Sequence, residues 1–429
     1  MKKMKSIENT IKTIAFVLPQ FHAIPENDEW WGKGFTEWVN VKRGKPNFTG
    51  HYQPHVPAGL NYYSLLNPKT RAKQASLAKK HGVYGFCYHH YWFGGKELLQ
   101  KPIMEILKTG KPDFPFCICW ANENWTRSWD GKDKEILIKQ DHSVKNDNSF
   151  IDHLLEVFED ERYIKVNGKP LLLIYKISLL ADPRKTISYW RKCCEDSGLN
   201  GLYVCAVDHF IDKTPEKYGV DAFVEFAPHG LHDKSMDCGD VIITNPSFRG
   251  SLRDMESVVL KSLLKKSPVY TYYRGVMPSW DNTARRQDSG VTFVNSSPAL
   301  FEFWYHEIVK RIIKSGEKNK LVFVNAWNEW AEGCHLEPDK KYGTSFLKVI
   351  KRVNDFYNND IIKKRYAEYS FLFNDNDMYR RLIIKALKMS NRIGFYQKVI
   401  ETIKQKIRKN KIVYRIVFFV WAMIRKKKD

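Results

Sequence analysis

The sequence lacks the glycine-rich loops with which many proteins hold nucleotide phosphates. No G-x-G-x-x-G follows its first predicted strand, and the pattern G-x-x-x-x-G-K-[ST] does not occur. In such loops, backbone N–H groups at the start of a helix bind the phosphate. We therefore expect neither a dinucleotide-binding fold nor a P-loop nucleotidase.

Patterns of metal ligands are also absent. The eight cysteines form no C-x-x-C pair, no cysteine–histidine spacing suits zinc, and H-E-x-x-H does not occur. His89 and His90 are adjacent, so their side chains would point apart on a strand. Asp208 and His209 follow a predicted strand, but no G-x-S-x-G accompanies them, which argues against a hydrolase triad. We predict a protein without metal or cofactor.

Long hydrophobic runs are missing as well. The apolar stretch near the N-terminus has five residues before Pro19, too few for a signal peptide. A later run, Ile416 to Ile424, has nine residues, whereas a spanning helix needs about 20. Four cysteines lie inside apolar, strand-like runs, where cysteine acts as a small hydrophobic residue. These features favour a reduced, cytoplasmic location.

Acidic residues are scarce at the C-terminal end of the chain. Residues 379–429 contain 16 Lys and Arg against two acids, which is +14 of the total net charge of +22. The rest of the chain therefore gives little reason to expect nucleic-acid binding. Residues 404–429 combine basic clusters with the apolar run and Trp421, a composition suited to an anionic membrane surface. The alternative is a helix that packs on the main domain and has a solvated basic end.

Eight short apolar runs alternate with helical patterns over about 340 residues, which is typical of a (β/α)8 TIM barrel. A doubly wound open sheet is the alternative, but its glycine-rich loop is absent. We predict an α/β barrel over residues 1–357 and a basic helical extension over residues 358–429. The eight expected strands are Ile14–Leu18, Val83–Tyr88, Phe114–Trp120, Pro170–Tyr175, Leu202–Val207, Val220–Phe226, Val269–Gly275 and Leu321–Trp327.

The last of these runs continues into LVFVNAWNEWAEG, residues 321–333, where two carboxylates lie between and beside tryptophans. The carboxyl ends of all strands face one side of a barrel, so polar residues that follow them should line one cleft. Aromatic rings suit the apolar C–H faces of sugars, and carboxylate, amide and histidine groups suit their hydroxyls. We expect the substrate-binding residues to be His22, Trp38, Tyr52, His89, Tyr91, Trp92, Trp120, Asn122, Glu123, Trp125, Asp208, Glu225, Trp280, Trp327, Asn328 and Trp330.

Glu329 and Glu332 are the candidate catalytic residues. Cleavage of a glycosidic bond needs a proton donor at the leaving oxygen and a second group at the anomeric centre. Apolar surroundings would raise the pKa of one acid and make it the donor. On most chains E-x-x-E is a solvated helix face, but here it directly follows a buried strand.

The sequence resembles the WbsX-like family, also described as glycoside hydrolase family 99-like proteins. The resemblance covers about residues 12–350 and rests on AFVLPQFH, NDEWWGKGFTEW, GFCYHHYWF, FCICWANENW and NAWNEWAEG. It implies a role in bacterial cell-surface polysaccharide biosynthesis, such as O-antigen (lipopolysaccharide) or capsule. The related hydrolases are retaining endo-α-mannosidases with a (β/α)8 barrel.

In those hydrolases the corresponding motif is E-W-H-E, and this sequence has Ala331 in place of the histidine. By the resemblance, Glu329 assists attack by the sugar's own 2-hydroxyl, through a 1,2-anhydro intermediate, and Glu332 is the general acid/base. We therefore expect a retaining glycosidase or transglycosidase that acts on an oligosaccharide or polysaccharide. The alternatives are a sugar-nucleotide-dependent glycosyltransferase and a non-catalytic glycan-binding barrel.

Overall fold

The computed structural model of the chain describes residues 10–127, 132–209, 214–231 and 241–358, together with Met378, Arg381, Leu382 and Lys385. The side chains of residues 132–134 are also outside this description. Nearly all of the expected basic extension, residues 358–429, and all of its expected membrane segment, residues 404–429, lie outside the described residues. The expected boundary at residue 357 falls at the end of the last described helix, α11 (Ser345–Asn358).

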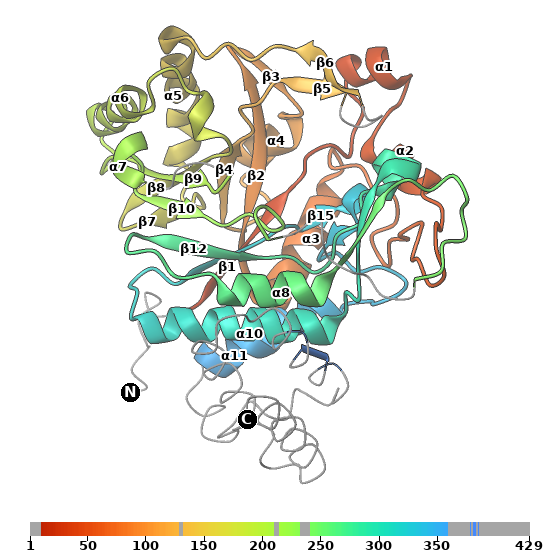
Figure 1. Cartoon of the computed structure of the whole chain (residues 1–429). Helices are drawn as coiled ribbons and strands as arrows, with labels where there is room; N and C mark the ends of the chain where they lie inside the picture. The colour runs from red at the N-terminus through yellow and green to blue at the C-terminus, as the bar shows by residue number, and fades with distance from the viewer. Residues whose placement is uncertain are drawn as a thin grey trace.

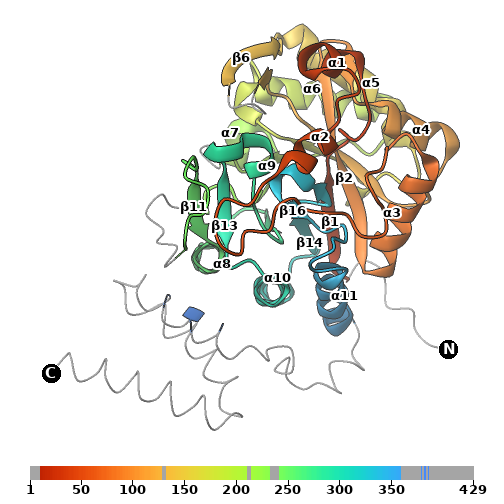
Figure 2. The same cartoon turned by 90° about the vertical axis from the view of Figure 1, so that its right-hand side faces the viewer.

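Eight parallel strands form a closed barrel, as the sequence predicted (Figures 1 and 2). Neighbours along the chain are neighbours in the barrel, and β1 pairs with both β2 and β14 to close it. The barrel strands are β1 (Lys12–Val17), β2 (Val83–Phe93), β4 (Phe116–Trp120), β8 (Lys169–Ile174), β9 (Tyr203–Val207), β10 (Ala222–Val224), β12 (Tyr272–Val276) and β14 (Leu321–Val324).

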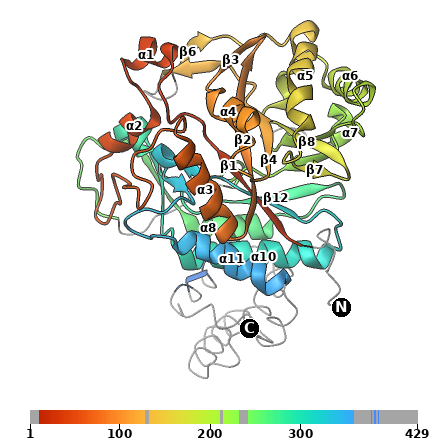
Figure 3. The same ribbon diagram turned by 180° about the vertical axis from the view of Figure 1, so that it is seen from behind.

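Helices surround the barrel, and α8, α10 and α11 lie together on one side of it (Figures 1 and 3). Their starts follow from local chemistry, because the side chains of Asp182, Asp254 and Ser297 each accept a hydrogen bond from the first turn of the helix that follows. The α-helices other than α11 are α1 (Pro25–Trp31), α2 (Glu37–Arg43), α3 (Pro68–Lys80), α4 (Lys101–Thr109), α5 (Val144–Glu159), α6 (Pro183–Asp196), α7 (Pro215–Tyr218), α8 (Met255–Leu264), α9 (Thr283–Arg286) and α10 (Pro298–Ser315).

The barrel strands are buried on both faces, which explains their continuous apolar runs. Phe16 lies in the barrel interior, with its ring centroid 4.8 Å from that of Phe226 and 5.7 Å from that of Phe323. The His89 ring stacks on Phe16 at 5.6 Å. These aromatic rings pack against one another inside the barrel.

Strand β2 is longer than the sequence pattern indicated. The run 89–92 was expected to follow the strand, but β2 continues to Phe93 and pairs in antiparallel fashion with β3 (Lys96–Leu98). Three further small pairings lie outside the barrel: β5 (Trp125–Arg127) with β6 (Lys132–Ile138), β11 (Ser251–Asp254) with β13 (Val291–Val294), and β15 (Asn328–Glu329) with β16 (Cys334–His335). The short strand β7 (Lys165–Val166) pairs with β8.

Four residues beyond α11 contact the barrel domain. Met378 and Leu382 are buried, and Arg381 and Lys385 each lie 2.7 Å from a carboxylate oxygen of Glu256 at the start of α8. The chain after α11 therefore returns to α8. Among the described residues, no helix combines the length and apolar character needed to cross a bilayer.

Candidate active site

The segment after β14 is fixed by hydrogen bonds of its own side chains. Asn328 accepts from the backbone N–H of Leu18 at 2.8 Å and donates to the Leu18 carbonyl at 3.0 Å, which ties the segment to the end of β1. Trp327 and Trp330 donate their indole N–H groups to the carboxylate of Glu337 at 3.0 and 2.7 Å. These anchors flank Glu329, and Glu332 follows Trp330 by two residues.

Glu337 also accepts hydrogen bonds from Tyr63 and Gln74, each at 2.7 Å. Four donors from three segments therefore meet at one buried carboxylate. Burial raises the pKa of Glu337 to about 7, although these donors favour its charged form. Glu337 therefore holds the segment after β14 in place through its hydrogen bonds with the two indoles.

One guanidinium binds three carboxylates at the mouth of the barrel. Arg285 donates from Nε to Glu37 Oε1 at 2.7 Å, from Nη1 to Glu332 Oε1 at 2.6 Å and from Nη2 to Glu329 Oε2 at 2.9 Å. Glu37 comes from α2, after β1, and Arg285 from α9, after β12, so segments that follow two different strands meet at the two glutamates of the motif. The planar, three-directional donor set of arginine suits this arrangement.

Three carboxylates share the single buried cation of Arg285, and the pKa values of two of these acids are raised. Burial raises the pKa of Glu332 to about 7; Arg285 opposes this shift, and the negative charges of Glu329 and Glu37 add to it. Burial also raises the pKa of Glu37 above its usual value, against the effect of Arg285. Glu332 can therefore hold a proton near neutral pH, as a general acid must.

A cavity of about 320 Å³ lies over Glu329 and Glu332. Its walls carry aromatic and polar side chains, including His89, Tyr91 and Tyr175, which come from the ends of β2 and β8. Burial lowers the pKa of His89, but Cys119 and the two glutamates outweigh it, so the net shift is upward. The cavity thus combines flat apolar surfaces with a carboxylate pair, a lining that suits a sugar ring.

The cavity brings together seven of the residues that the sequence analysis singled out: His89, Tyr91, Glu123, Trp125, Trp280, Glu329 and Glu332. They come from the ends or following loops of β2, β4, β12 and β14. Tyr52 lies elsewhere, in a second cavity that Trp280 also lines.

Six of the other expected residues are tryptophans or asparagines that hold the framework. Trp38 donates to the Tyr63 carbonyl and packs on Phe21, and Trp120 stacks on Phe150 at 4.2 Å. The side chain of Asn122 spans the backbone N–H and carbonyl of Lys176. Trp327, Asn328 and Trp330 make the contacts described above, and none of these six lines the cavity at the two glutamates.

The remaining four expected residues also lie outside that cavity. Asp208 and Glu225 accept hydrogen bonds from Lys265, and Glu225 also accepts one from Arg274 at 2.7 Å. They form an ion network on the α8 side of the barrel. Trp92 packs against Phe150 and His153, and His22 is buried, which lowers its pKa to about 4.

Two important residues were not among the expected site residues. Glu37 begins α2 and Arg285 lies within α9, and their sequence separation of 248 residues hides the contact. Both helices are short, and no local pattern indicates that they converge. Tyr175, Phe226 and His229 also line the cavity, at strand ends that the pattern located correctly.

Two groups of described side chains have donor atoms close enough to hold a metal ion: His55, His335 and Asp339, and His90, Glu97 and His153. In the first group the two imidazoles already contact each other at 2.8 Å, and His335 Nδ1 lies 2.9 Å from the Glu337 carbonyl. Hydrogen bonding therefore accounts for these histidines. Neither group includes Glu329 or Glu332.

Comparison with solved structures shows the same fold. A structure described as a glycoside hydrolase-like protein aligns with 80% of this chain and 94% of its own, at 14% identity and a TM-score of 0.51. The GH99 endo-α-mannosidase of Bacteroides thetaiotaomicron aligns with 83% of this chain and 98% of its own, at 15% identity and a TM-score of 0.49. At 14% identity the likeness to the first of these structures concerns the fold alone.

Sequence relatives are closer. The uncharacterised protein WxcX of Xanthomonas campestris pv. campestris is 41% identical over 340 residues in each of two strains. That match covers 79% of this chain and 49% of WxcX, so the chain spans about half the length of these relatives. The family described as glycosyltransferase WbsX matches residues 13–350, which contain the whole barrel and both candidate catalytic glutamates. The chain therefore belongs to the WbsX glycosyltransferase family.

Proposed function

We propose that this chain is a carbohydrate-active enzyme that cleaves or transfers a glycosidic bond with retention, with Glu332 as general acid/base and Glu329 as the assisting base. The observation that carries the proposal is the electrostatic state of Glu332, whose pKa of about 7 lets it donate a proton near neutral pH. Membership of a glycosyltransferase family supports the class of substrate.

The first chemical step uses both acids at once. Glu332 gives its proton to the glycosidic oxygen as the bond from C1 to that oxygen breaks. Glu329 accepts the proton of the sugar's 2-hydroxyl while that oxygen bonds to C1, which forms a 1,2-anhydro sugar. The departing glycan leaves with a neutral hydroxyl, and Glu332 is left as a carboxylate.

The second step reverses these proton movements. A water or an acceptor hydroxyl bonds to C1 and gives its proton to Glu332, while the 2-oxygen leaves C1 and recovers its proton from Glu329. Water as the acceptor gives hydrolysis, and a glycan hydroxyl gives transfer. Because C1 is attacked twice, its configuration is retained.

Arg285 positions the two acids for these steps. Its terminal nitrogens contact one oxygen of each, and its Nε is held by the buried Glu37. A fixed guanidinium of this kind sets the distance and direction between the two carboxylates before the substrate binds.

The substrate we propose is an oligosaccharide or polysaccharide of the bacterial cell surface, such as O-antigen or capsule, handled on the cytoplasmic side of the membrane. The family supports a glycan in general. Ala331 follows Trp330 in the motif, where the related hydrolases have histidine, so we leave the sugar itself unassigned.

A second candidate is transfer from a sugar nucleotide, which the description of the family favours. The two candidates differ in what the enzyme consumes. A retaining glycosidase or transglycosidase acts on the glycan alone, whereas a sugar-nucleotide-dependent enzyme needs the activated donor.

One experiment separates the candidates. Purified protein is incubated with oligosaccharides from its own host's surface polysaccharide, with and without a panel of sugar nucleotides, and products are followed by mass spectrometry. New products without nucleotide support the first candidate, and products that require nucleotide support the second. Glu332→Gln should abolish turnover, with Glu161→Gln, at an exposed position, as the control. Undiminished activity in Glu332→Gln would remove the assignment of Glu332, and no products in any mixture would favour a glycan-binding barrel.

A further inference from the structure

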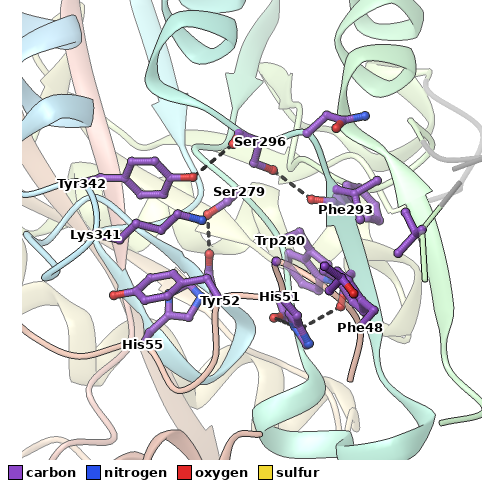
Figure 4. A pocket seen from close by; sticks show the side chains of 18 of the residues that line it. Phe48, His51, Tyr52, His55, Ser279, Trp280, Phe293, Ser296, Lys341 and Tyr342 are labelled. Carbon is purple, nitrogen blue, oxygen red and sulfur yellow. Dashed lines mark hydrogen bonds and ion pairs between the residues drawn. The ribbon is translucent and has the colours of Figure 1, made fainter. Parts of the chain in front are cut away.

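A second cavity, of about 360 Å³, lies beside the candidate active site (Figure 4). Six separate stretches of the chain supply its walls: residues 48–55, 241–242, 279–281, 292–296, 333 and 341–342. Its volume is within the range of small-molecule sites, about 300–1,000 Å³. Trp280 lines both this cavity and the one over Glu329 and Glu332.

The two cavities are joined by backbone as well as by this indole. The backbone N–H of Asp281 donates to the Glu332 carbonyl at 2.6 Å, and Gly333 lines the second cavity. A glycan that crosses the Trp280 side chain would therefore place neighbouring sugar residues in the two cavities.

The lining of the second cavity suits a sugar ring. It is lined by the aromatic side chains of Trp280 and Phe293 and by Ser296 and Tyr342, whose hydroxyls donate to backbone carbonyls and can still accept a hydrogen bond. Aromatic faces stack on C–H surfaces of a pyranose, and hydroxyls exchange hydrogen bonds with those of the sugar.

Asp281 is at the wall of this cavity, but its charge is already satisfied. Its carboxylate contacts His51 Nε2 and Gln53 Nε2, both at 2.7 Å, and accepts hydrogen bonds from Thr283 and Thr292. Although burial raises the pKa of Asp281, these donors hold it at about 2. Asp281 therefore fixes the wall and leaves little for a ligand.

Lys341 is the contrasting case. Its ammonium lies 4.9 Å from the ring centroids of both Tyr52 and Tyr342, and Figure 4 shows the side chain extending between these two rings. Across the described part of the chain, no carboxylate lies within ion-pair distance of it. Cation–π contacts hold the ammonium in place and leave its charge open to an anion.

We propose that the second cavity is a subsite for an acidic sugar residue, a hexuronate, whose ring stacks on the aromatic wall and whose carboxylate pairs with Lys341. The proposal rests on the glycan-directed function given above and extends it to the class of polymer, an acidic polysaccharide. The aromatic wall favours a sugar carboxylate over a free inorganic anion, because only the sugar uses both features.

The test is binding of small probes to the full chain, measured by ligand-observed NMR. The probes are the methyl glycosides of glucuronate and galacturonate, the matched neutral glucoside and galactoside, and inorganic phosphate. We expect at least one uronide to bind more tightly than its neutral partner. Lys341→Gln should weaken uronide binding roughly three- to fivefold, as expected for a partly exposed ion pair, and leave neutral glycosides unchanged.

Lys340→Gln is the matched control, because Lys340 is also exposed but does not line the cavity. Uronide binding should be unchanged in this variant. Equal binding of uronide and neutral glycoside, an absence of uronide binding up to tens of millimolar, or the same loss in both lysine variants would overturn the proposal. Phosphate that displaces the uronide at equal concentration would show a general anion site instead and would also overturn it.

The same assay separates this inference from the proposed function. Glu332→Gln should keep the full preference for uronide, since Glu332 does not line the second cavity. Lysine-dependent uronide binding without turnover on any glycan would sink only the catalytic proposal. Turnover with no role for Lys341 in binding would sink only the subsite.

Discussion

Arg285 and Glu37 form a buried ion pair, with Arg285 Nε 2.7 Å from Glu37 Oε1, across 248 residues of sequence. The pair turns the guanidinium so that its other two nitrogens face Glu329 and Glu332. The positions of the two candidate catalytic acids thus depend on a contact between α2 and α9.

Replacing Arg285 by lysine should impair catalysis severely, because one ammonium cannot bind three carboxylates in fixed directions. We expect kcat to fall about 100-fold or more, in line with small misplacements of reacting groups. Steady-state kinetics on the glycan substrate provides the measurement. Arg249→Lys is a suitable control, because that guanidinium bonds only to carbonyls of its own exposed loop among the contacts given for it. Equal activity of the two variants would contradict a positioning role for Arg285.

The pH dependence of activity should report Glu332. As general acid it must be protonated in the free enzyme, so kcat/KM should fall about tenfold per pH unit above pH 7. Arg285 lowers the pKa of Glu332, so Arg285→Gln should move this alkaline limb to higher pH. A limb that stays in place in Arg285→Gln would mean that another group titrates.

The free energy of unfolding should also depend on the protonation of Glu332. The pKa of Glu332 is raised from 4.5 to about 7 on folding, so the folded chain binds more protons than the unfolded chain between these values. Its contribution to stability is therefore full below pH 4.5 and is lost as pH rises through about 7. At pH 8, Glu332→Gln should be more stable than the parent by about 3 kcal/mol. Urea unfolding at pH 4.5 and pH 8 tests this, and an equal difference at both values would count against it.

Glu337 should matter for the shape of the site and not for its proton chemistry. Glu337→Gln places an amide against donors from Trp327, Trp330, Tyr63 and Gln74, and at least one of them loses its acceptor. We expect a loss of about 1–3 kcal/mol in the free energy of unfolding, with lower kcat and an unchanged alkaline limb. Chemical denaturation and pH–rate profiles of the same variant give both readouts. A shifted limb would instead assign Glu337 to proton transfer.

The basic C-terminal segment can be tested apart from the barrel. A chain ending at residue 403 keeps Met378 and Leu382, which are buried against the barrel domain, and lacks the basic and apolar residues 404–429. We expect the full chain to sediment with vesicles containing phosphatidylserine and the shortened chain to remain in the supernatant. Binding of the full chain should weaken at high salt. Equal sedimentation of the two chains would remove the membrane role of this segment.

The sequence pattern located the barrel because each strand is buried on both faces and therefore reads as a short apolar run. It could not show that β2 continues beyond Tyr88, since the pairing with β3 depends on a turn that brings Tyr91 opposite Leu98. Local patterns were enough to predict the fold class, whereas the length of β2 depends on its pairing with β3.

The sequence predicted those site residues whose position depends only on the end of a strand. Glu329 and Glu332 follow β14 directly, and both line one cavity with His89 and Trp280. The direction in which each side chain points was harder to predict, because a residue at a strand end can point inward or outward. Glu225 follows β10 but turns toward Arg274 and Lys265, and Trp327 turns toward Glu337.

Trp280 lines both the cavity over Glu329 and Glu332 and the second cavity. A ligand in one cavity that favours one orientation of this side chain changes the surface offered in the other. Thermodynamic linkage then requires reciprocity: whatever factor an acidic sugar imposes on binding over Glu329 and Glu332, a sugar bound there must impose on the acidic one. A single side chain would in this way let the enzyme sense the composition of the polymer one residue away from the bond that it handles.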